Sequence, residues 1–325
     1  MLKKLHHEAT GQVALYQNED RYETLLAGLF GARFHAYRQR WRAASQRGDP
    51  GDFPLSLDLA INSGCQLRCL MCPLPSRSPR VRLMPEALYE RLMAQAREHR
   101  LPALTLGLAS EPLLHPRAMR TVRLAARAGV MDIRLGTNGA ALNEQIIDEA
   151  IDSRLTRLEV SLDAARASTY ALIRGGDFDR LTRAIDLFLA KRLAAGSPTP
   201  LLRLSFLMLP ENKNELRPFL ARWADRADLI SIQSPIWFPG SARPRPQKPG
   251  RPQASACAQA WQRLAVNHDG HVWPCCSWYG EELLTLNAGR LDIADIWRSA
   301  EVNELRANLA GPPEKTPGPC RLCEF

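Results

Sequence analysis

The sequence lacks the features that would place a protein in a membrane or outside the cell. No run of about 18 apolar residues occurs in the 325 residues, so we expect no membrane-spanning helix. The N-terminal residues, MLKKLHHE, continue into polar and charged sequence, so no signal peptide is predicted. We therefore expect a cytoplasmic protein.

Cysteine is scarce: the chain holds eight, and all of them lie in groups with the spacing of metal ligands. So few cysteines in so long a chain exclude a scaffold that depends on disulfides. In a cytoplasmic protein, clustered cysteines favour the binding of a metal or an iron–sulfur cluster instead.

Acidic residues are outnumbered, with 34 Asp and Glu against 43 Lys and Arg, and the net charge is +9. A basic balance is typical of nucleic-acid binding. Thiolate-bound clusters carry negative charge that this count omits, however, so we do not predict a nucleic-acid partner.

The most informative motif is Cys65-x3-Cys69-x2-Cys72, directly after the apolar run 55–61. Three thiolates on one short loop can hold three irons of a 4Fe–4S cluster and leave the fourth iron open to a small molecule. The next cysteine is Cys257, so no fourth ligand follows nearby. The motif lies at the end of a predicted strand, where α/β folds place their chemistry. A zinc site or buried thiols is the alternative interpretation.

The segment from 55 to 233 alternates between strand and helix patterns. Apolar and alternating runs predict strands at 55–61, 103–108, 131–136, 156–161, 201–207 and 228–233. Helical spacing predicts helices near 84–99, 116–129, 143–153, 177–194 and 212–226. Six β/α repeats with right-handed crossovers give a parallel sheet that curves into a partial barrel.

The flanks of this barrel differ from it in composition. Apolar residues between Tyr22 and Trp41 recur at helical spacing, which predicts an amphipathic helix packed on the main domain. A helix that binds a membrane surface or a partner is the alternative. Repeated Pro and Arg at 239–253 predict a linker. The predicted parts are an N-terminal helical extension (1–52), the barrel (53–238), the linker (239–253) and a second cysteine-containing domain (254–325).

The cysteine motif together with the β/α pattern resembles the radical S-adenosylmethionine (SAM) superfamily. The resemblance implies a partial (β/α)6 TIM-like barrel whose open iron binds SAM. It implies that reductive cleavage of SAM yields a 5′-deoxyadenosyl radical, which removes a hydrogen atom from the substrate.

The resemblance also implies a SAM site along the carboxyl ends of the strands. Glu111 and Ser110 lie where the family has a Gly-Gly-Glu-Pro segment that engages the methionyl amine, although here Ala109-Ser110 replaces the two glycines. A carboxylate opposite an ammonium group makes a charge-assisted hydrogen bond. The other residues implied are Asn138 near the methionyl end, Ser161 and Asp163 near the ribose, and Arg174 at the SAM carboxylate.

The remaining cysteines lie in the C-terminal part, at Cys257, Cys275, Cys276, Cys320 and Cys323. Asp269-Gly270 predicts a tight turn between two short strands, and a helix is expected near 293–310. This arrangement resembles the SPASM/Twitch domains that bind auxiliary clusters. It implies one auxiliary 4Fe–4S cluster, the Twitch form, held by Cys257, Cys275, Cys320 and Cys323. Four thiolates would also suit zinc.

Cys276 is left over if Cys275 is the ligand, although either of the adjacent pair could bind the cluster. Cys276 could be a buried small hydrophobe. Alternatively it is a catalytic hydrogen-atom donor, as in some radical SAM epimerases.

These observations predict a radical SAM oxidoreductase with two 4Fe–4S clusters and SAM as cofactors. The preferred reaction is a two-electron oxidation of a sugar, aminocyclitol or peptide, with the auxiliary cluster accepting an electron. Epimerisation with Cys276 as donor and peptide-modifying maturation are alternatives, and a non-catalytic electron-transfer or binding protein is an alternative of another class. The expected partners are the small-molecule or peptide substrate and a one-electron reductant such as flavodoxin or ferredoxin.

Overall fold

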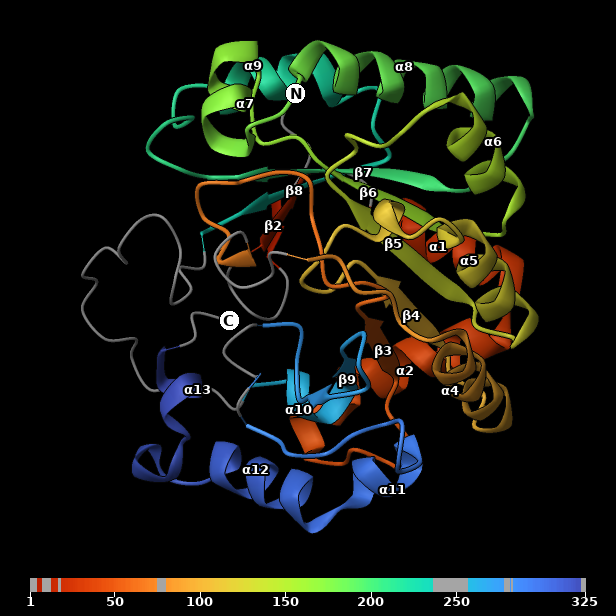
Figure 1. Ribbon diagram of the computed structural model, residues 1–325, viewed down its shortest axis with the longest axis vertical. Coiled ribbons are helices and arrows are strands. Elements are labelled where there is room, and N and C mark those ends of the chain that lie inside the picture. The colour runs from red at the N-terminus through yellow and green to blue at the C-terminus, as the bar shows by residue number, and fades with distance from the viewer. Residues whose placement is uncertain are drawn as a thin grey trace.

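The computed structural model describes residues 5–7, 13–16, 19–74, 80–235, 257–277, 281 and 283–322 (Figure 1). The side chains of residues 5–7, 13–16, 19, 20, 45, 47 and 322 are not among those described. The predicted linker 239–253 and Cys323 lie outside the described residues.

The centre of the fold is a parallel sheet whose strands follow one another in chain order, which confirms the predicted α/β partial barrel. Its strands are β3 (Ser56–Leu59), β4 (Ala103–Leu106), β5 (Asp132–Thr137), β6 (Arg157–Ser161), β7 (Leu201–Leu207) and β8 (Leu229–Gln233). The helices between them are α4 (Glu86–Glu98), α5 (Ala118–Arg127), α6 (Glu144–Asp152), α7 (Ala167–Arg174), α8 (Phe178–Ala194) and α9 (Leu216–Trp223). All were predicted except α7, and α9 is shorter than the predicted 212–226.

The two faces of this sheet differ because successive side chains of a strand point to opposite sides. The outward residues, such as Leu57, Ile133 and Leu158, are buried in one large apolar core with the helices. The inner face carries polar and charged residues at the alternate positions. Substrate and cofactor chemistry in such a fold is therefore expected on the inner face and at the carboxyl ends of the strands.

Further strands extend the sheet at both edges. On one side β2 (Val13–Tyr16) pairs with β8 and β1 (Leu5–His7) pairs with β2, both antiparallel. On the other side β9 (Arg263–Val266) runs parallel to β3, and β10 (Val272–Trp273) pairs antiparallel with β9. The described strands thus form one ten-stranded sheet. The N-terminal strands β1 and β2 were not predicted.

The hairpin of β9 and β10 confirms the turn expected at Asp269-Gly270. Gly270 has a φ of 88°, which favours glycine. A Cβ atom at this position would also lie only 2.7 Å from the side-chain oxygen of Asn287. The turn therefore requires glycine both for its conformation and for its space.

The single N-terminal helix predicted between Tyr22 and Trp41 was wrong, because the chain forms two helices, α1 (Glu19–Phe30) and α2 (Ala32–Arg47). Gly31 separates them with a φ of 56°. Apolar residues of this pair, among them Leu26 and Phe34, pack on the first residues of the strands, such as Leu55 and Leu201. The pair therefore covers the amino ends of the barrel strands.

The helix predicted near 293–310 is likewise two helices, α11 (Ile293–Arg298) and α12 (Ala300–Ala310). Ser299 lies between them with a ψ of 155°, and its hydroxyl accepts a hydrogen bond from the Val302 amide as an N-cap. The shorter elements are η1 (Pro112–Leu114), α10 (Gln259–Gln262), η3 (Pro313–Lys315) and α13 (Gly318–Leu322). No helix in the described part of the chain is long and apolar enough to cross a membrane.

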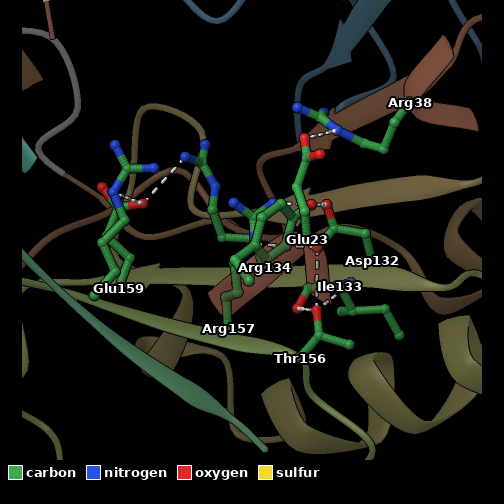
Figure 2. Close-up of polar contacts among 10 residues, drawn as sticks. Glu23, Arg38, Asp132, Ile133, Arg134, Thr156, Arg157 and Glu159 are labelled. Carbon is green, nitrogen blue, oxygen red and sulfur yellow. Dashed lines mark hydrogen bonds and ion pairs between the residues drawn. The ribbon is translucent and has the colours of Figure 1, made fainter. Parts of the chain in front are cut away.

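A buried polar network joins the helix pair to the barrel (Figure 2). The Asp132 carboxylate, 1% exposed, accepts hydrogen bonds from the Tyr22 hydroxyl at 2.6 Å and from Arg157 Nη2 at 2.7 Å. The Thr156 hydroxyl donates to it at 3.1 Å. A buried carboxylate is tolerated because these donors replace the water that it loses.

We expect Tyr22→Phe to destabilise the protein, because it removes one hydrogen bond to a buried charge. Such a bond contributes about 1.5–3 kcal/mol. For a chain of this length that loss corresponds to a fall in the unfolding temperature of about 2–4 °C. Calorimetric scans of anaerobically reconstituted protein measure it. Tyr37→Phe is the matched control, because no hydrogen bond of the Tyr37 hydroxyl is found among the described residues. Equal unfolding temperatures for both variants would contradict the role given to Tyr22.

Candidate active site

The three cysteines of the first motif lie on the loop that follows β3. They share one apolar cluster with Leu67 and Ile173, and Cys69 is 8% exposed. Burial raises the pKa of the Cys65 thiol, and it raises the pKa of Cys72 to about 11. Iron binds the thiolate, so the charge of the metal has to offset this cost of deprotonation.

The surroundings of the thiols fit an iron–sulfur cluster. The Asn138 side-chain amide donates to Cys65 Sγ at 3.3 Å, and Arg174 Nη1 donates to Cys69 Sγ at 3.6 Å. N–H groups directed at sulfur stabilise its negative charge when it ligates a cluster. Within the described residues no three His, Cys, Asp or Glu side chains converge on a single metal ion. Cluster thiolates need no such convergence, because each binds a different iron.

Glu111 connects the cluster loop to the end of β5. Its side chain is buried, and its two carboxylate oxygens accept hydrogen bonds from the Thr137 hydroxyl at 2.7 Å and from the Asn138 amide at 2.7 Å. Its backbone amide donates to the Gly64 carbonyl at 2.8 Å, and the Asn62 side chain donates to its carbonyl at 2.8 Å. Burial raises the pKa of Glu111, and the hydrogen bonds it accepts oppose that rise.

The structure brings several of the predicted SAM residues to one edge of the sheet. Asn138 follows β5 and is buried, and its side chain reaches Cys65 and Gln66. Ser161 is the last residue of β6. The Ser110 hydroxyl donates to the Leu108 carbonyl at 3.0 Å in the loop after β4. Their roles toward SAM remain predictions from the sequence.

Asp163 and Arg174 form a buried ion pair. Arg174 Nε donates to Asp163 Oδ2 at 2.5 Å, and the Leu207 amide donates to Asp163 Oδ1 at 2.7 Å. Burial alone would lower the pKa of Arg174, but Asp163 raises it above its ordinary value. The guanidinium thus lies between Asp163 and the sulfur of Cys69, at the end of α7. Sequence reasoning missed α7, although Gly175, with a φ of 71°, is a usual residue at a helix C-terminus.

The adjacent cysteines of the C-terminal part have different surroundings. Cys276 packs with Leu108, Ala109 and Trp273, so it lies against the loop that follows β4. Burial raises the pKa of the Cys276 thiol, Arg263 lowers it, and Asp58 raises it. The Cys275 thiol instead contacts the Ser277 carbonyl, at 3.9 Å. Cys257 and Cys320 are partly exposed. Of the four cysteines predicted to bind the auxiliary cluster, all but Cys323 thus lie within the described residues.

Sequence reasoning also missed the charged residues on the inner face. Asp58, Arg134, Glu159, Arg203 and Arg263 occupy alternate positions of their strands, opposite the apolar core. Arg263 donates to Asp58 at 3.0 Å, and Arg134 donates to Glu159 at 3.1 Å. The signal was present in the sequence for all of them but Arg263, since each of the other charges is flanked by apolar residues in a predicted strand, as in Arg157-Leu-Glu-Val-Ser161.

Comparison with protein families identifies the family to which the chain belongs. The sequence model of the Radical SAM superfamily matches residues 59–221, and that of the SPASM iron–sulfur cluster-binding domain matches residues 257–324. The chain belongs to the radical SAM superfamily and carries a SPASM domain. These domains indicate 4Fe–4S clusters and SAM as its cofactors.

Curated relatives are distant and match only in part. GTP 3',8-cyclase of Chlorobaculum tepidum is 28% identical over 176 residues, which cover 53% of this chain and 50% of the cyclase. AdoMet-dependent heme synthase of Methanosarcina barkeri is 30% identical over 131 residues, 39% of this chain and 37% of the synthase. The chain spans about half the length of the curated cyclases that it matches.

Solved structures share the fold at low identity. Streptococcus suis SuiB bound to S-adenosylmethionine has a TM-score of 0.67 and is 14% identical; the match covers 95% of this chain and 79% of SuiB. BtrN in complex with AdoMet and 2-DOIA has a TM-score of 0.51 and is 16% identical, with 78% of this chain and 86% of BtrN covered. Both structures contain bound SAM, and both share their overall fold with this chain.

We expect anaerobically reconstituted protein to bind about eight irons, since two 4Fe–4S clusters hold four each. Replacing Cys65, Cys69 and Cys72 together with Ala should leave about four irons. Iron and sulfide analysis measures both. Cys276→Ala is the matched control and should keep about eight irons if Cys275 is the ligand. A wild-type protein with zinc and no sulfide at the second site would contradict the prediction.

We expect Glu111→Ala to weaken SAM binding, because the charge-assisted hydrogen bond predicted between Glu111 and the methionyl amine would be lost. The loss of about 1.5–3 kcal/mol corresponds to an approximately 10- to 150-fold higher Kd. Titration calorimetry with reconstituted enzyme measures this change. Thr137→Val is the control, because it removes one hydrogen bond to the carboxylate and keeps the charge. Unchanged SAM affinity in Glu111→Ala, with iron content intact, would remove Glu111 from the SAM site.

Proposed function

We propose that this chain is a radical SAM oxidoreductase that dehydrogenates its substrate with the auxiliary cluster as electron acceptor. The observation that carries the proposal is the parallel pairing of β9 with β3. The loop after β3 carries the first cysteine motif, and β9 leads through β10 to Cys275. Ligands for both clusters thus follow neighbouring strands of one sheet.

The proposed reaction removes two electrons and two protons from the substrate. The family's chemistry would supply a 5′-deoxyadenosyl radical that takes one hydrogen atom from carbon. The substrate radical would then lose a proton to a base and one electron to the auxiliary cluster. An external one-electron donor of the flavodoxin or ferredoxin class would reduce the first cluster.

Some residues of this chain are proposed to bind SAM, and others to orient the residues that bind it. Glu111, Asn138 and Arg174 border the cysteine loop and are proposed to bind the methionyl part of SAM, while Ser110, Ser161 and Asp163 lie on the same edge of the sheet. The Arg174 contacts to Asp163 and Cys69 would orient the guanidinium before SAM arrives.

The substrate is proposed to be a sugar, an aminocyclitol or a peptide. Support comes from the neighbouring folds, which include BtrN with 2-DOIA and SuiB with its precursor peptide SuiA. A peptide-modifying maturase is therefore a variant of the same proposal. A non-catalytic cluster protein is the alternative of another class, and it would release no 5′-deoxyadenosine on reduction with SAM present.

Epimerisation is the second candidate, and one observation favours it. Cys276 packs against Ala109, next to the predicted SAM residue Ser110. The charges of Asp58 and Arg263 on the inner face shift the pKa of its thiol in opposite directions. A thiol in this position could return a hydrogen atom to a substrate radical. The net reaction would then be redox-neutral, and the thiyl radical would require one electron and one proton to be restored.

We expect the substrate, turned over in deuterated water, to give a product two hydrogens lighter without deuterium at carbon. The reason is that dehydrogenation returns no hydrogen atom to the carbon radical. Mass spectrometry of the product measures this, and Cys276→Ser should still form product. The Ser variant is the control for size, because its O–H bond is too strong to donate a hydrogen atom. A product that carries one deuterium in place of one hydrogen of the substrate, and that is lost in Cys276→Ser with both clusters present, would establish epimerisation instead.

A further inference from the structure

A cleft lies at the amino ends of the barrel strands, whereas the cysteine loop lies beyond their carboxyl ends. Its volume is about 630 Å³, within the usual range of sites for small molecules. Leu55, Pro102 and Met131, which directly precede β3, β4 and β5, line the cleft together with residues of α2. The cleft is therefore separate from the proposed SAM site.

Of the described residues that line the cleft, those with a permanent charge are all arginines. Arg33 and Arg40 come from α2, and Arg100 comes from the loop between α4 and β4. All three are exposed, and none of them forms an ion pair within the described part of the chain. The carboxylates of Asp52 and Glu98 are adjacent to lining residues in the sequence, but neither lines the cleft.

The guanidinium groups keep N–H donors for a ligand, since each carries five. Arg33 Nη2 donates to the Gly129 carbonyl at 3.2 Å. No other side-chain hydrogen bond of Arg33, Arg40 or Arg100 is found among the described residues. A concave surface with charge of one sign and open donors attracts ions of the opposite sign.

Arg100 occupies a backbone position where glycine is usual. Its φ is 53°, and it directly follows the C-cap of α4. The Leu101 amide donates to the Ala96 carbonyl at 2.8 Å, and the Arg100 amide donates to the Arg97 carbonyl at 3.3 Å. These are the two hydrogen bonds of a Schellman motif, whose left-handed residue is most often glycine. An arginine here strains the backbone, and such strain is concentrated at functional sites.

The dipole of α4 offers a structural explanation for Arg100, because cations are favoured near a helix C-terminus. It does not explain Arg33 and Arg40, which come from a different helix and face the same cleft. The three arginines therefore have the cleft in common rather than a single helix end.

The cleft also contains a buried hydrogen-bond donor. Tyr37 lines it and is 5% exposed, and its hydroxyl has no hydrogen-bond partner among the described residues. Burial and the nearby charge of Asp132 raise the pKa of Tyr37 to about 12, so the hydroxyl keeps its proton. Arg157 offsets the charge of Asp132 through two hydrogen bonds, at 3.1 and 2.7 Å. A buried polar group without a partner is costly, and an acceptor on a ligand would supply one.

Apolar and aromatic groups complete the lining. The rings of Phe53 and His99 are stacked, with centroids 4.4 Å apart and planes 10° apart. Phe53, Leu55, Pro102 and Met131 are buried, whereas the arginines are exposed. Apolar lining with a few polar groups is typical of sites for organic molecules. The cleft therefore suits a molecule with an apolar body and an anionic group better than it suits a bare ion.

We propose that this cleft binds a small organic anion whose phosphate or carboxylate pairs with Arg33, Arg40 and Arg100. Guanidinium N–H groups bind either oxyanion through charge-assisted hydrogen bonds. The ligand contacts α2 on one side and the α4–β4 loop on the other, so it links the N-terminal helix pair to the barrel. This second site does not depend on the proposed radical chemistry.

Titration calorimetry of the reconstituted full chain, without SAM or reductant, tests the site. Phenyl phosphate represents the phosphate source, benzoate represents the carboxylate source, and benzyl alcohol is the neutral analogue. We expect saturable binding of at least one anion and much weaker binding of the alcohol. Arg40→Gln should weaken the binding of the anion about five-fold or more. Arg226→Gln, which removes an exposed arginine paired with Asp186, is the matched control and should leave it unchanged.

Arg100→Gly gives the decisive second measurement. Glycine relieves the strained backbone, so the unfolding temperature should equal or exceed that of the wild type, while the affinity for the anion should fall about five-fold or more. A purely structural arginine predicts the reverse, a lower unfolding temperature with unchanged affinity. No saturable binding of either anion to the wild type would overturn the proposal. Unchanged affinity in both Arg40→Gln and Arg100→Gly would overturn it as well, because the anion would then bind elsewhere.

Discussion

The buried carboxylate of Glu111 is the constraint on which the arrangement of the site depends. Its oxygens bond to Thr137 and to the Asn138 amide, and its backbone bonds to the loop that carries the first cysteine motif. A loop of this length around three thiols has many conformations, and ordering it costs entropy. Glu111 limits these conformations by tying the loop to the end of a rigid strand. The same contact holds Asn138 in place. Because the Asn138 side chain donates to Cys65 Sγ, Glu111 also affects the environment of that sulfur.

Polar groups are tolerated inside this barrel because they have hydrogen-bond or ion-pair partners, and the kind of partner changes along the strands. Near the amino ends, the helix pair α1 and α2 covers the strands, and Asp132 is saturated by Tyr22, Thr156 and Arg157. Further along the strands, Arg134 pairs with Glu159, and the Asn138 side-chain amide lies beside the cysteine loop at the carboxyl ends. The polar groups of the barrel thus join it to the helix pair near the amino ends and surround the cysteines near the carboxyl ends.

Much of the fold could be predicted from the sequence, because the regular spacing of apolar residues shows which side of a strand or helix is buried. The predicted strands and the helices α4, α5, α6, α8 and α9 follow from it. The break at Gly31 could not be placed by spacing alone, since apolar residues on both sides keep helical intervals. Strands β1 and β2 were missed because edge strands this short leave little pattern. The cysteine motif predicted the first ligand set, but the position of Cys276 depends on the register of β9 and β10, which no local pattern encodes.

The pairing of β9 with β3 and of β2 with β8 has a consequence for solubility. A partial barrel, unlike a closed one, ends in two strands whose backbone N–H and C=O groups face outward, and such edges template pairing between molecules. In this chain the added strands move the edges of the sheet to β1 and β10, which are three and two residues long. Edges this short offer few backbone groups for pairing between molecules. The C-terminal segment that leads to Cys275 therefore also limits the addition of strands from other molecules on the β3 side of the barrel.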